Sequence, residues 1–180
     1  YMTPIEIIHW ILFTVLALAA LAALAAYLKS FAITNPPLRR TPVVHIPDQY
    51  RLVHEVIDFS TADGIQLKGW FIPAEGGESG KTLILCHGWG ANRGELLRDT
   101  CFLAAQGFNL FYFDFRGSGE SGGELSSVGY LETRDFDAAY EFLTHNRPHA
   151  CERVGVFGTS MGGSVAVFAA AKYPELKCLL

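Results

Sequence analysis

The feature that most constrains the fold is an alternation of short apolar runs with segments of helical spacing in the second half of the chain. The apolar runs are residues 82–86, 109–113 and 153–157, and each has the length and content of a strand buried on both faces. The helical segments are residues 94–106, 131–144 and 160–173. Strand and helix in strict alternation predict an α/β fold with a mostly parallel sheet and helices on both of its faces.

An antiparallel hairpin is predicted before this alternation. Residues 53–59 and 65–72 are rich in β-forming side chains, and Asp63-Gly64 between them has the composition of a tight turn. The hairpin would add an antiparallel edge to the sheet. Gly107 stands where a glycine C-cap would end the helix predicted over 94–106.

The N-terminal segment predicts one transmembrane helix. Residues 7–28 are apolar except for His9 and Thr14, and a helix of that length extends roughly 33 Å, enough to cross the hydrocarbon core. Pro36-Pro37 then opens a linker. The expected organisation is a membrane anchor over residues 1–30, a linker over 31–50 and a globular domain over 51–180.

A cleaved signal peptide is the alternative interpretation of this segment, because its Ala-Leu-Ala repeats resemble cleavage sites. A signal peptide has a basic n-region and a shorter apolar core, whereas Glu6 precedes this run and no lysine or arginine does. The basic residues Lys29, Arg39 and Arg40 follow the run. By the positive-inside rule they predict a single-pass membrane protein with a cytoplasmic globular domain.

Composition excludes several classes of function. The chain has 18 acidic and 14 basic residues, and the basic residues form no cluster of the kind that nucleic-acid binding needs, so no nucleic-acid partner is expected. The four cysteines are far apart with no CxxC pair, which argues against zinc and thioredoxin-like sites. We expect free structural thiols in a reducing compartment, no metal site and no cofactor.

The central motif is Gly-Thr-Ser-Met-Gly-Gly at residues 158–163, between a predicted strand and a predicted helix. A nucleophile at the top of a sheet needs a tight strand-to-helix turn, which puts Ser160 in a strained backbone conformation. Gly158 and Gly162 leave room for the neighbouring strand and helix. The dipole of the helix that begins at Ser160 favours developing negative charge. The alternative interpretation is an ordinary glycine-rich turn.

A second motif, Cys-His-Gly-Trp-Gly at residues 86–90, follows the first buried strand. Acyl transfer needs two N–H donors directed at the carbonyl oxygen as it becomes an oxyanion. The backbone N–H groups of Met161 and Trp89 are the predicted donors, and Gly88 and Gly90 let backbone approach a substrate. The alternative is a plain glycine turn with Trp89 packed in the core.

A third motif follows the strand at 109–113, where Gly117, Gly119 and Gly122 match GxGxxG. A dinucleotide-binding loop would open a helix at once, but here the loop continues to residue 131, and no Walker lysine follows. Nucleotide binding is therefore not expected. We predict a packed turn in which Asp114 and Arg116 pair with each other, with Asp114 structural rather than catalytic.

Together these motifs, HGWG at 87–90, DFRGSGESGG at 114–123 and GTSMGG at 158–163, resemble the N-terminal half of an α/β-hydrolase. The resemblance covers most of residues 53–180 and is closest to membrane-tethered members similar to the serine-aminopeptidase-like group. It implies an α/β-hydrolase fold and a nucleophile at Ser160. It also implies that His87 belongs to the oxyanion loop, because in this fold the base follows the nucleophile in the chain.

The resemblance also implies an acid and a histidine later in the chain. Beyond Ser160 the only acidic residue is Glu175, and all six histidines precede Ser160. We therefore expect a fragment that lacks its C-terminal third. The predicted function is a serine hydrolase that cleaves an ester, thioester or amide of a small-molecule or acylated substrate through an acyl-enzyme on Ser160. The alternative is a catalytically inactive scaffold or partner-binding protein that kept the fold and lost the base.

Overall fold

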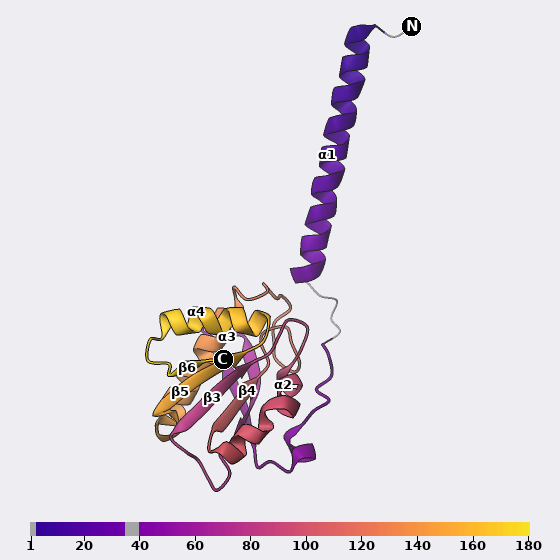
Figure 1. Ribbon diagram of the computed structural model, residues 1–180. Coiled ribbons are helices and arrows are strands. Elements are labelled where there is room, and N and C mark those ends of the chain that lie inside the picture. The colour runs from indigo at the N-terminus through magenta and orange to yellow at the C-terminus, as the bar shows by residue number, and fades with distance from the viewer. Residues whose placement is uncertain (1–2, 35–39) are drawn as a thin grey trace. The chain divides into compact units, whose positions relative to one another are not determined.

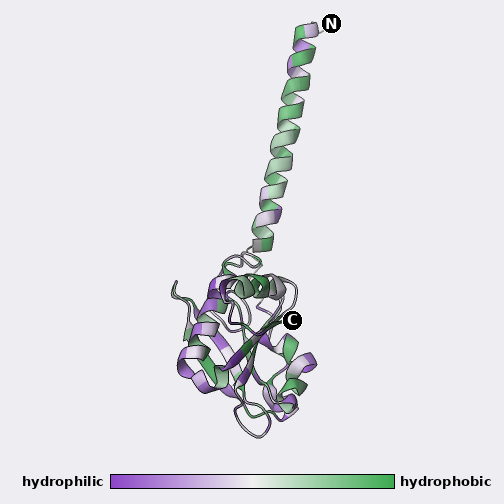
Figure 2. Cartoon of the chain, turned by 60° about the vertical axis from the view of Figure 1, so that its left-hand side comes forward, coloured by the Kyte–Doolittle hydropathy of each residue, from purple (hydrophilic) through white to green (hydrophobic). Residues whose placement is uncertain are grey.

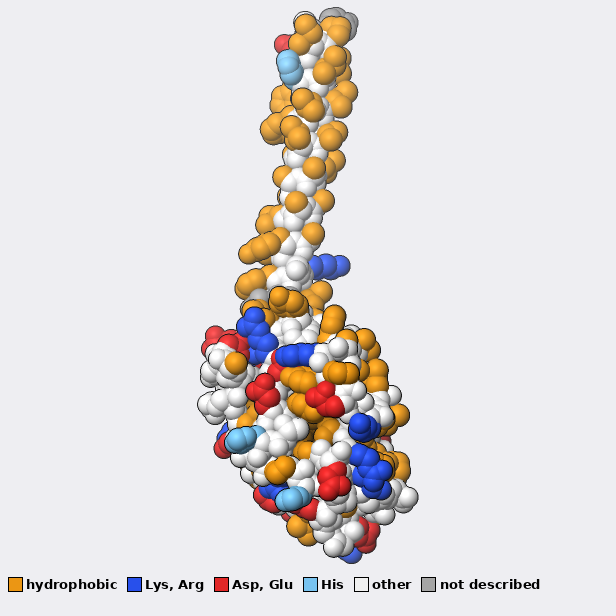
Figure 3. All heavy atoms as spheres, turned by 90° about the vertical axis from the view of Figure 1, so that its left-hand side faces the viewer, with side chains coloured by type: hydrophobic (Ala, Val, Ile, Leu, Met, Phe, Trp, Pro, Cys, Tyr) orange, Lys and Arg blue, Asp and Glu red, His pale blue; other side chains and the backbone are white. Residues whose placement is uncertain are grey.

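The computed structural model describes residues 3–34 and 40–180, which divide into an N-terminal helix and a domain that begins at residue 40 (Figure 1). Helix α1 (Pro4–Thr34) has 31 residues. Its segment Pro4–Ile33 has a mean hydropathy of 2.5. Hydrophobic residues occur along the whole helix (Figure 2), and apolar side chains cover the face that Figure 3 shows. The helix is therefore long and apolar enough to span a membrane, and it is longer at both ends than the predicted run of residues 7–28.

The domain contains one six-stranded sheet with strand order β1-β2-β4-β3-β5-β6. The strands are β1 (Glu55–Ser60), β2 (Gln66–Ile72), β3 (Lys81–Cys86), β4 (Asn109–Phe113), β5 (Arg153–Gly158) and β6 (Cys178–Leu179). β1 pairs with β2 and β2 with β4 in antiparallel fashion, whereas β4, β3, β5 and β6 run parallel. The predicted parallel sheet and its antiparallel hairpin are both confirmed.

Helices cover both faces of this sheet, as the alternation predicts. The α-helices of the domain are α2 (Arg93–Thr100), α3 (Glu132–Asn146) and α4 (Met161–Lys172). Short 3-10 helices occupy Pro47–Tyr50, Cys101–Gln106 and Pro148–Cys151. Helix α2 packs on one face, and α3 and α4 pack on the other (Figure 1).

Each face has its own apolar core, and the central strands contribute to both. In β3, Ile84 and Cys86 belong to the core beneath α3 and α4, while Leu83 and Leu85 belong to the core beneath α2. Successive side chains of a strand point to opposite faces. A strand that is covered on both faces therefore needs apolar residues at every position, which explains the continuous apolar runs in the sequence.

The single helix predicted over 94–106 is wrong in its second half, where α2 ends at Thr100 and a 3-10 helix follows. The Thr100 hydroxyl hydrogen-bonds to the Leu96 carbonyl at 2.5 Å and to the Tyr112 hydroxyl at 2.8 Å. Such side-chain bonding to the preceding turn competes with regular helix geometry. Gly107 ends the segment in the left-handed conformation, with φ 81°, as its predicted C-cap role requires.

The four cysteines are free, as expected, but they differ in exposure. Cys86 is buried in β3 and behaves as a small apolar residue. Cys178 is exposed in β6, which pairs with β5 at Gly155 and Val156. Both residues of β6 are exposed in the part of the chain that the structure describes.

Candidate active site

Ser160 occupies the sharp turn between β5 and α4. Its backbone has φ 52° and ψ −116°, a conformation that a residue with a side chain adopts only when the surrounding structure forces it. The residue is exposed, and α4 begins immediately after it at Met161. The strained backbone predicted for Ser160 is present, and it presents the hydroxyl at the carboxyl edge of the sheet.

Two glycines make this turn sterically possible. A Cβ atom on Gly158 would lie 2.3 Å from the Gly162 carbonyl oxygen, and one on Gly162 would lie 2.1 Å from the Cys86 carbonyl oxygen. Both distances are far below van der Waals contact, so neither position accommodates a side chain without movement of backbone. The motif is therefore more than a flexible turn, because α4 packs directly on the end of β3.

The turn after β3 contacts the turn at Ser160. The Thr159 N–H donates to the Cys86 carbonyl at 3.1 Å, and a Cβ added to Gly88 would lie 3.5 Å from the Ser160 Cβ. Residues more than 70 positions apart in the sequence are thus adjacent. They are adjacent because β3 and β5 are parallel neighbours whose carboxyl ends meet at one edge of the sheet.

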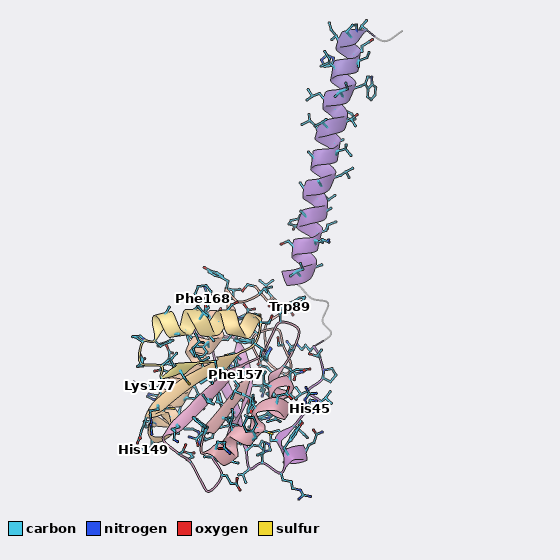
Figure 4. The ribbon with its side chains drawn as sticks, in the orientation of Figure 1. His45, Trp89, His149, Phe157, Phe168 and Lys177 are labelled. Carbon is cyan, nitrogen blue, oxygen red and sulfur yellow. The ribbon has the colours of Figure 1, made fainter. Side chains whose placement is uncertain are left out.

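The two predicted oxyanion donors lie on either side of this contact. Met161 is buried at the first position of α4, where backbone N–H groups have no partner within the helix. Trp89 is 42% exposed on the loop after β3 and is labelled in Figure 4. The exposed indole excludes the alternative in which Trp89 packs in the core.

His87 is wholly buried, and both of its ring nitrogens have partners. The Phe115 N–H donates to Nε2 at 3.0 Å, so Nε2 is unprotonated, and Nδ1 then donates to the Gly88 carbonyl at 2.7 Å. Burial lowers the pKa of the ring, which keeps it neutral. His87 therefore joins the loop after β3 to the loop after β4 and has no nitrogen left for Ser160.

The predicted pairing of Asp114 with Arg116 is wrong. Asp114 is wholly buried and pairs with Arg93 at the start of α2, accepting from its backbone N–H at 2.6 Å and from its guanidinium at 2.5 Å. The Glu120 N–H also donates to this carboxylate at 2.9 Å. Asp114 thus links the end of β4, the following loop and the N-terminus of α2, where a negative charge is favourable.

Arg116 has partners in two other elements. Its backbone N–H and Nε donate to Asp135 of α3, both at 2.9 Å. Its guanidinium also contacts Asp63 of the hairpin turn at 2.9 and 3.1 Å. Asp114 and Arg116 are neighbours in sequence, but the chain turns between them, and their side chains reach different elements.

Glu132 is a polar residue of this region that the sequence analysis did not single out. It is wholly buried at the start of α3 and accepts hydrogen bonds from the backbone N–H groups of Ser127 and Gly129 and from the hydroxyls of Ser126 and Ser127, at 2.7–2.9 Å. Burial opposes its ionisation, but these donors outweigh burial and lower its pKa. The serines just before the helix were the only sign of this role in the sequence.

The loop held by Glu132 packs on the Ser160 turn. A Cβ added to Gly129 would lie 3.7 Å from the Ser164 Cβ and 3.8 Å from the Met161 side chain. Val128 in this loop has φ 55°, which is unfavourable for a β-branched residue. Glu132 therefore fixes a strained loop against the first turn of α4.

No histidine of residues 3–34 or 40–180 hydrogen-bonds to the Ser160 hydroxyl.

A groove of about 650 Å³ lies at the other end of the strands, lined by residues that include Leu52, Ile72 and Ala104. Because Ile72 pairs with Leu110 near the amino end of β4, this groove is not part of the Ser160 region.

Comparisons with known proteins identify the family of this chain. Residues 77–180 match the family model described as serine aminopeptidase, S33. The uncharacterised protein YfhR of Escherichia coli is 34% identical over 113 residues, which cover 61% of this chain and 39% of YfhR. The chain spans about two fifths of the length of the curated relatives it matches.

Solved structures give the same result. The Pyrococcus furiosus esterase Pf2001 is similar with a TM-score of 0.73 and 34% identity, covering 80% of this chain and 56% of the esterase. The α/β serine hydrolase XC6422 of Xanthomonas campestris, at 23% identity and a TM-score of 0.58, covers 68% of this chain and 57% of its own and shows the likeness of fold. The chain belongs to the serine aminopeptidase S33 family and has the α/β-hydrolase fold.

Proposed function

We propose that this chain carries the nucleophile and the oxyanion donors of a membrane-anchored serine hydrolase. The observation that carries the proposal is the strained backbone of exposed Ser160, packed against the loop after β3 by Gly158 and Gly162. A strained residue persists only where the surrounding structure holds it, and such residues cluster at active sites. Membership of a family of hydrolases, and the likeness to an esterase, support the same reaction class.

The reaction proposed is acyl transfer to Ser160. As the hydroxyl gives up its proton to a base, Oγ attacks the carbonyl carbon of an ester, thioester or amide, and the carbonyl oxygen becomes an oxyanion. The backbone N–H groups of Met161 and Trp89 stabilise that charge. Collapse of the intermediate expels the alcohol, thiol or amine, which takes up a proton, and water then hydrolyses the acyl-enzyme.

The proposed base and acid are residues that the sequence of 180 residues does not include. His87 uses both ring nitrogens within the fold, and no histidine follows Ser160 in this sequence. Without a base the hydroxyl is a weak nucleophile near neutral pH. In this proposal residues 51–180 form the N-terminal part of the hydrolase domain, and residues 1–30 anchor it with the domain on the cytoplasmic side.

The test is fluorophosphonate labelling of the native protein in its membranes, because these reagents modify only activated serines. We expect labelling of the wild type, none in Ser160→Ala, and normal labelling in Ser164→Ala, which removes an exposed hydroxyl one turn further along α4. Intact mass of the labelled species shows whether it extends past Leu180. Absence of labelling in the wild type would contradict the proposal and favour an inactive scaffold.

A further inference from the structure

Four exposed apolar side chains lie on loops at the carboxyl edge of the sheet, the edge that holds Ser160. They are Trp89 on the loop after β3 and Leu125, Val128 and Tyr130 on the loop after β4, with exposed fractions of 42%, 42%, 42% and 75%. We call these four residues the apolar rim. Trp89 neighbours Gly88, which contacts Ser160, and residue 129 packs on Met161 and Ser164.

Hydrogen bonds fix the backbone of the loop that carries Val128 and Tyr130 of the apolar rim. Val128 keeps an unfavourable φ of 55° with its side chain partly exposed. The Glu132 carboxylate accepts hydrogen bonds from the backbone N–H groups of the residues on either side of Val128, Ser127 and Gly129. The Thr133 hydroxyl donates to the Tyr130 carbonyl at 2.7 Å. Val128 thus keeps a strained backbone conformation with an exposed side chain, in a loop that packs beside the proposed nucleophile.

Exposure alone does not identify what these side chains contact, because Val53 and Phe102, at the other end of the strands, are 78% and 60% exposed. The two ends of the strands differ in their contacts with the first residues of the domain. Arg40 donates to the carbonyls of Ser121 and Gly123, and the Thr41 hydroxyl donates to the Gly90 carbonyl at 3.2 Å.

These contacts attach the first residues of the domain to the loops that carry the apolar rim. The Asn92 side chain, at the N-cap of α2, also donates to the carbonyls of Thr41 and Pro42 at 3.1 and 3.2 Å. Only residues 35–39 separate Arg40 from the end of α1 at Thr34. The first described residues of the domain therefore lie at the apolar rim and not at the end that carries Val53 and Phe102.

We propose that the apolar rim docks on a lipid bilayer and that the substrate is a lipid ester, whose acyl chain passes from the bilayer to Ser160. This inference rests on the proposed function for its substrate. Aromatic side chains such as Trp89 and Tyr130 are favoured at the membrane interface, where one part of the ring is apolar and another polar. Burial of the rim in lipid would remove four apolar side chains from water.

The docking is tested with a fluorescent reporter on the full-length protein reconstituted in phosphatidylcholine vesicles. An environment-sensitive dye is attached in Tyr130→Cys and, as the matched control, in Phe102→Cys at the other end of the strands. Cys101, Cys151 and Cys178 are first replaced by serine, and Cys86 stays because it is wholly buried. We expect nitroxide-labelled lipid to quench the dye at 130, and aqueous iodide to quench the dye at 102. Equal quenching of both sites by iodide would overturn the proposal.

The substrate is tested by comparing a vesicle-borne long-chain ester with a water-soluble short-chain ester. Tyr130→Asp is expected to lower hydrolysis of the vesicle-borne ester about tenfold relative to the soluble ester, because the charge opposes insertion into lipid. An equal effect on both esters would contradict a lipid substrate. Fluorophosphonate labelling of the same samples separates the outcomes. Labelled Ser160 with an iodide-accessible rim refutes the docking alone. Unlabelled Ser160 refutes the proposed function and the lipid substrate with it, whereas the quenching still decides the docking.

Discussion

The Cα of Gly162 packs against the backbone carbonyl of Cys86 so closely that a Cβ at position 162 would lie 2.1 Å from the carbonyl oxygen. This contact joins the first turn of α4 to the end of β3, and both partners are backbone, so no side-chain rotation can relieve it. The relative position of Ser160 and the loop after β3 depends on this approach.

Gly162→Ala is therefore expected to destabilise the domain by about 3 kcal/mol, the upper part of the usual range for overpacking, and to abolish fluorophosphonate labelling. Gly163→Ala is the matched control, because its Cβ would meet the Gly158 carbonyl at 3.3 Å from the oxygen and 3.7 Å from the carbon, and alanine favours helix. Urea unfolding measures both variants. Equal stability of the two would contradict the packing argument.

Ser160→Gly is expected to stabilise the domain while it removes the proposed nucleophile. Glycine adopts φ 52° without steric cost, so the substitution relieves the backbone strain. The greater conformational entropy of glycine in the unfolded chain offsets part of this gain, and we expect a net stabilisation of about 1 kcal/mol. Ser160→Ala keeps the strain and should unfold like the wild type. Thermal unfolding of the three proteins is the measurement, and a Ser160→Gly variant no more stable than Ser160→Ala would show that the backbone is not strained.

Asp114→Ala is expected to cost about 3 kcal/mol, because it removes the buried carboxylate partner of the Arg93 guanidinium and leaves only the exposed carboxylate of Glu120. Arg93 is only 4% exposed, and its charge lies over the Trp70 ring at 4.3 Å, where water cannot replace the lost carboxylate. Asp99→Ala breaks the exposed pair with Arg98 and serves as the control, with no measurable loss of stability expected because solvent screens this pair. A small effect of Asp114→Ala in denaturant unfolding would contradict the structural role of the pair.

Asp63 should give the domain part of its acid sensitivity. Hydrogen bonds from Arg116, and then from the Thr61 hydroxyl, hold the pKa of Asp63 well below its ordinary value. A lowered carboxyl pKa contributes stability above the unfolded-state pKa near 4, and this contribution is lost as the pH falls further. Because Asp63 is 31% exposed, screening limits the contribution to about 1 kcal/mol.

The comparison that tests this is urea unfolding of the wild type and Asp63→Asn between pH 6 and pH 3. The difference in unfolding free energy between the two proteins should be constant above about pH 5 and should shrink below about pH 4. A difference that stayed constant down to pH 3 would mean that Asp63 does not titrate with folding.

Glu132→Gln is expected to cost about 3 kcal/mol, because a neutral amide replaces a buried carboxylate that accepts four hydrogen bonds. The loop should loosen, and amide exchange at Ser127 and Gly129 should quicken. Glu141→Gln, on the exposed side of the same helix, should leave both amides protected. Unchanged exchange in Glu132→Gln would show that the strained loop is held by other contacts.

The sequence by itself determined the local features of this protein. Residue periodicity fixes whether a segment can be a strand covered on two faces or a helix with one apolar stripe, so the parallel sheet, the hairpin and the helix before Pro36 were all predictable. The glycines around Ser160 were equally informative, because a tight strand-to-helix turn requires them. The close approach of Gly162 to the Cys86 carbonyl is a long-range contact that only the tertiary structure shows.

Only the tertiary structure decided which polar groups pair. Asp114 meets Arg93, 21 residues away, and Arg116 meets Asp63, 53 residues away, although Asp114 and Arg116 are two residues apart. The Tyr112 hydroxyl hydrogen-bonds to Thr100 at the residue where α2 ends. The hydrogen-bond donors to the Glu132 carboxylate lie in a loop whose sequence has no regular pattern. A buried charged group must pair with a group that the packing of helices and strands brings within hydrogen-bonding distance. The spacing of residues along the chain does not specify which group that is.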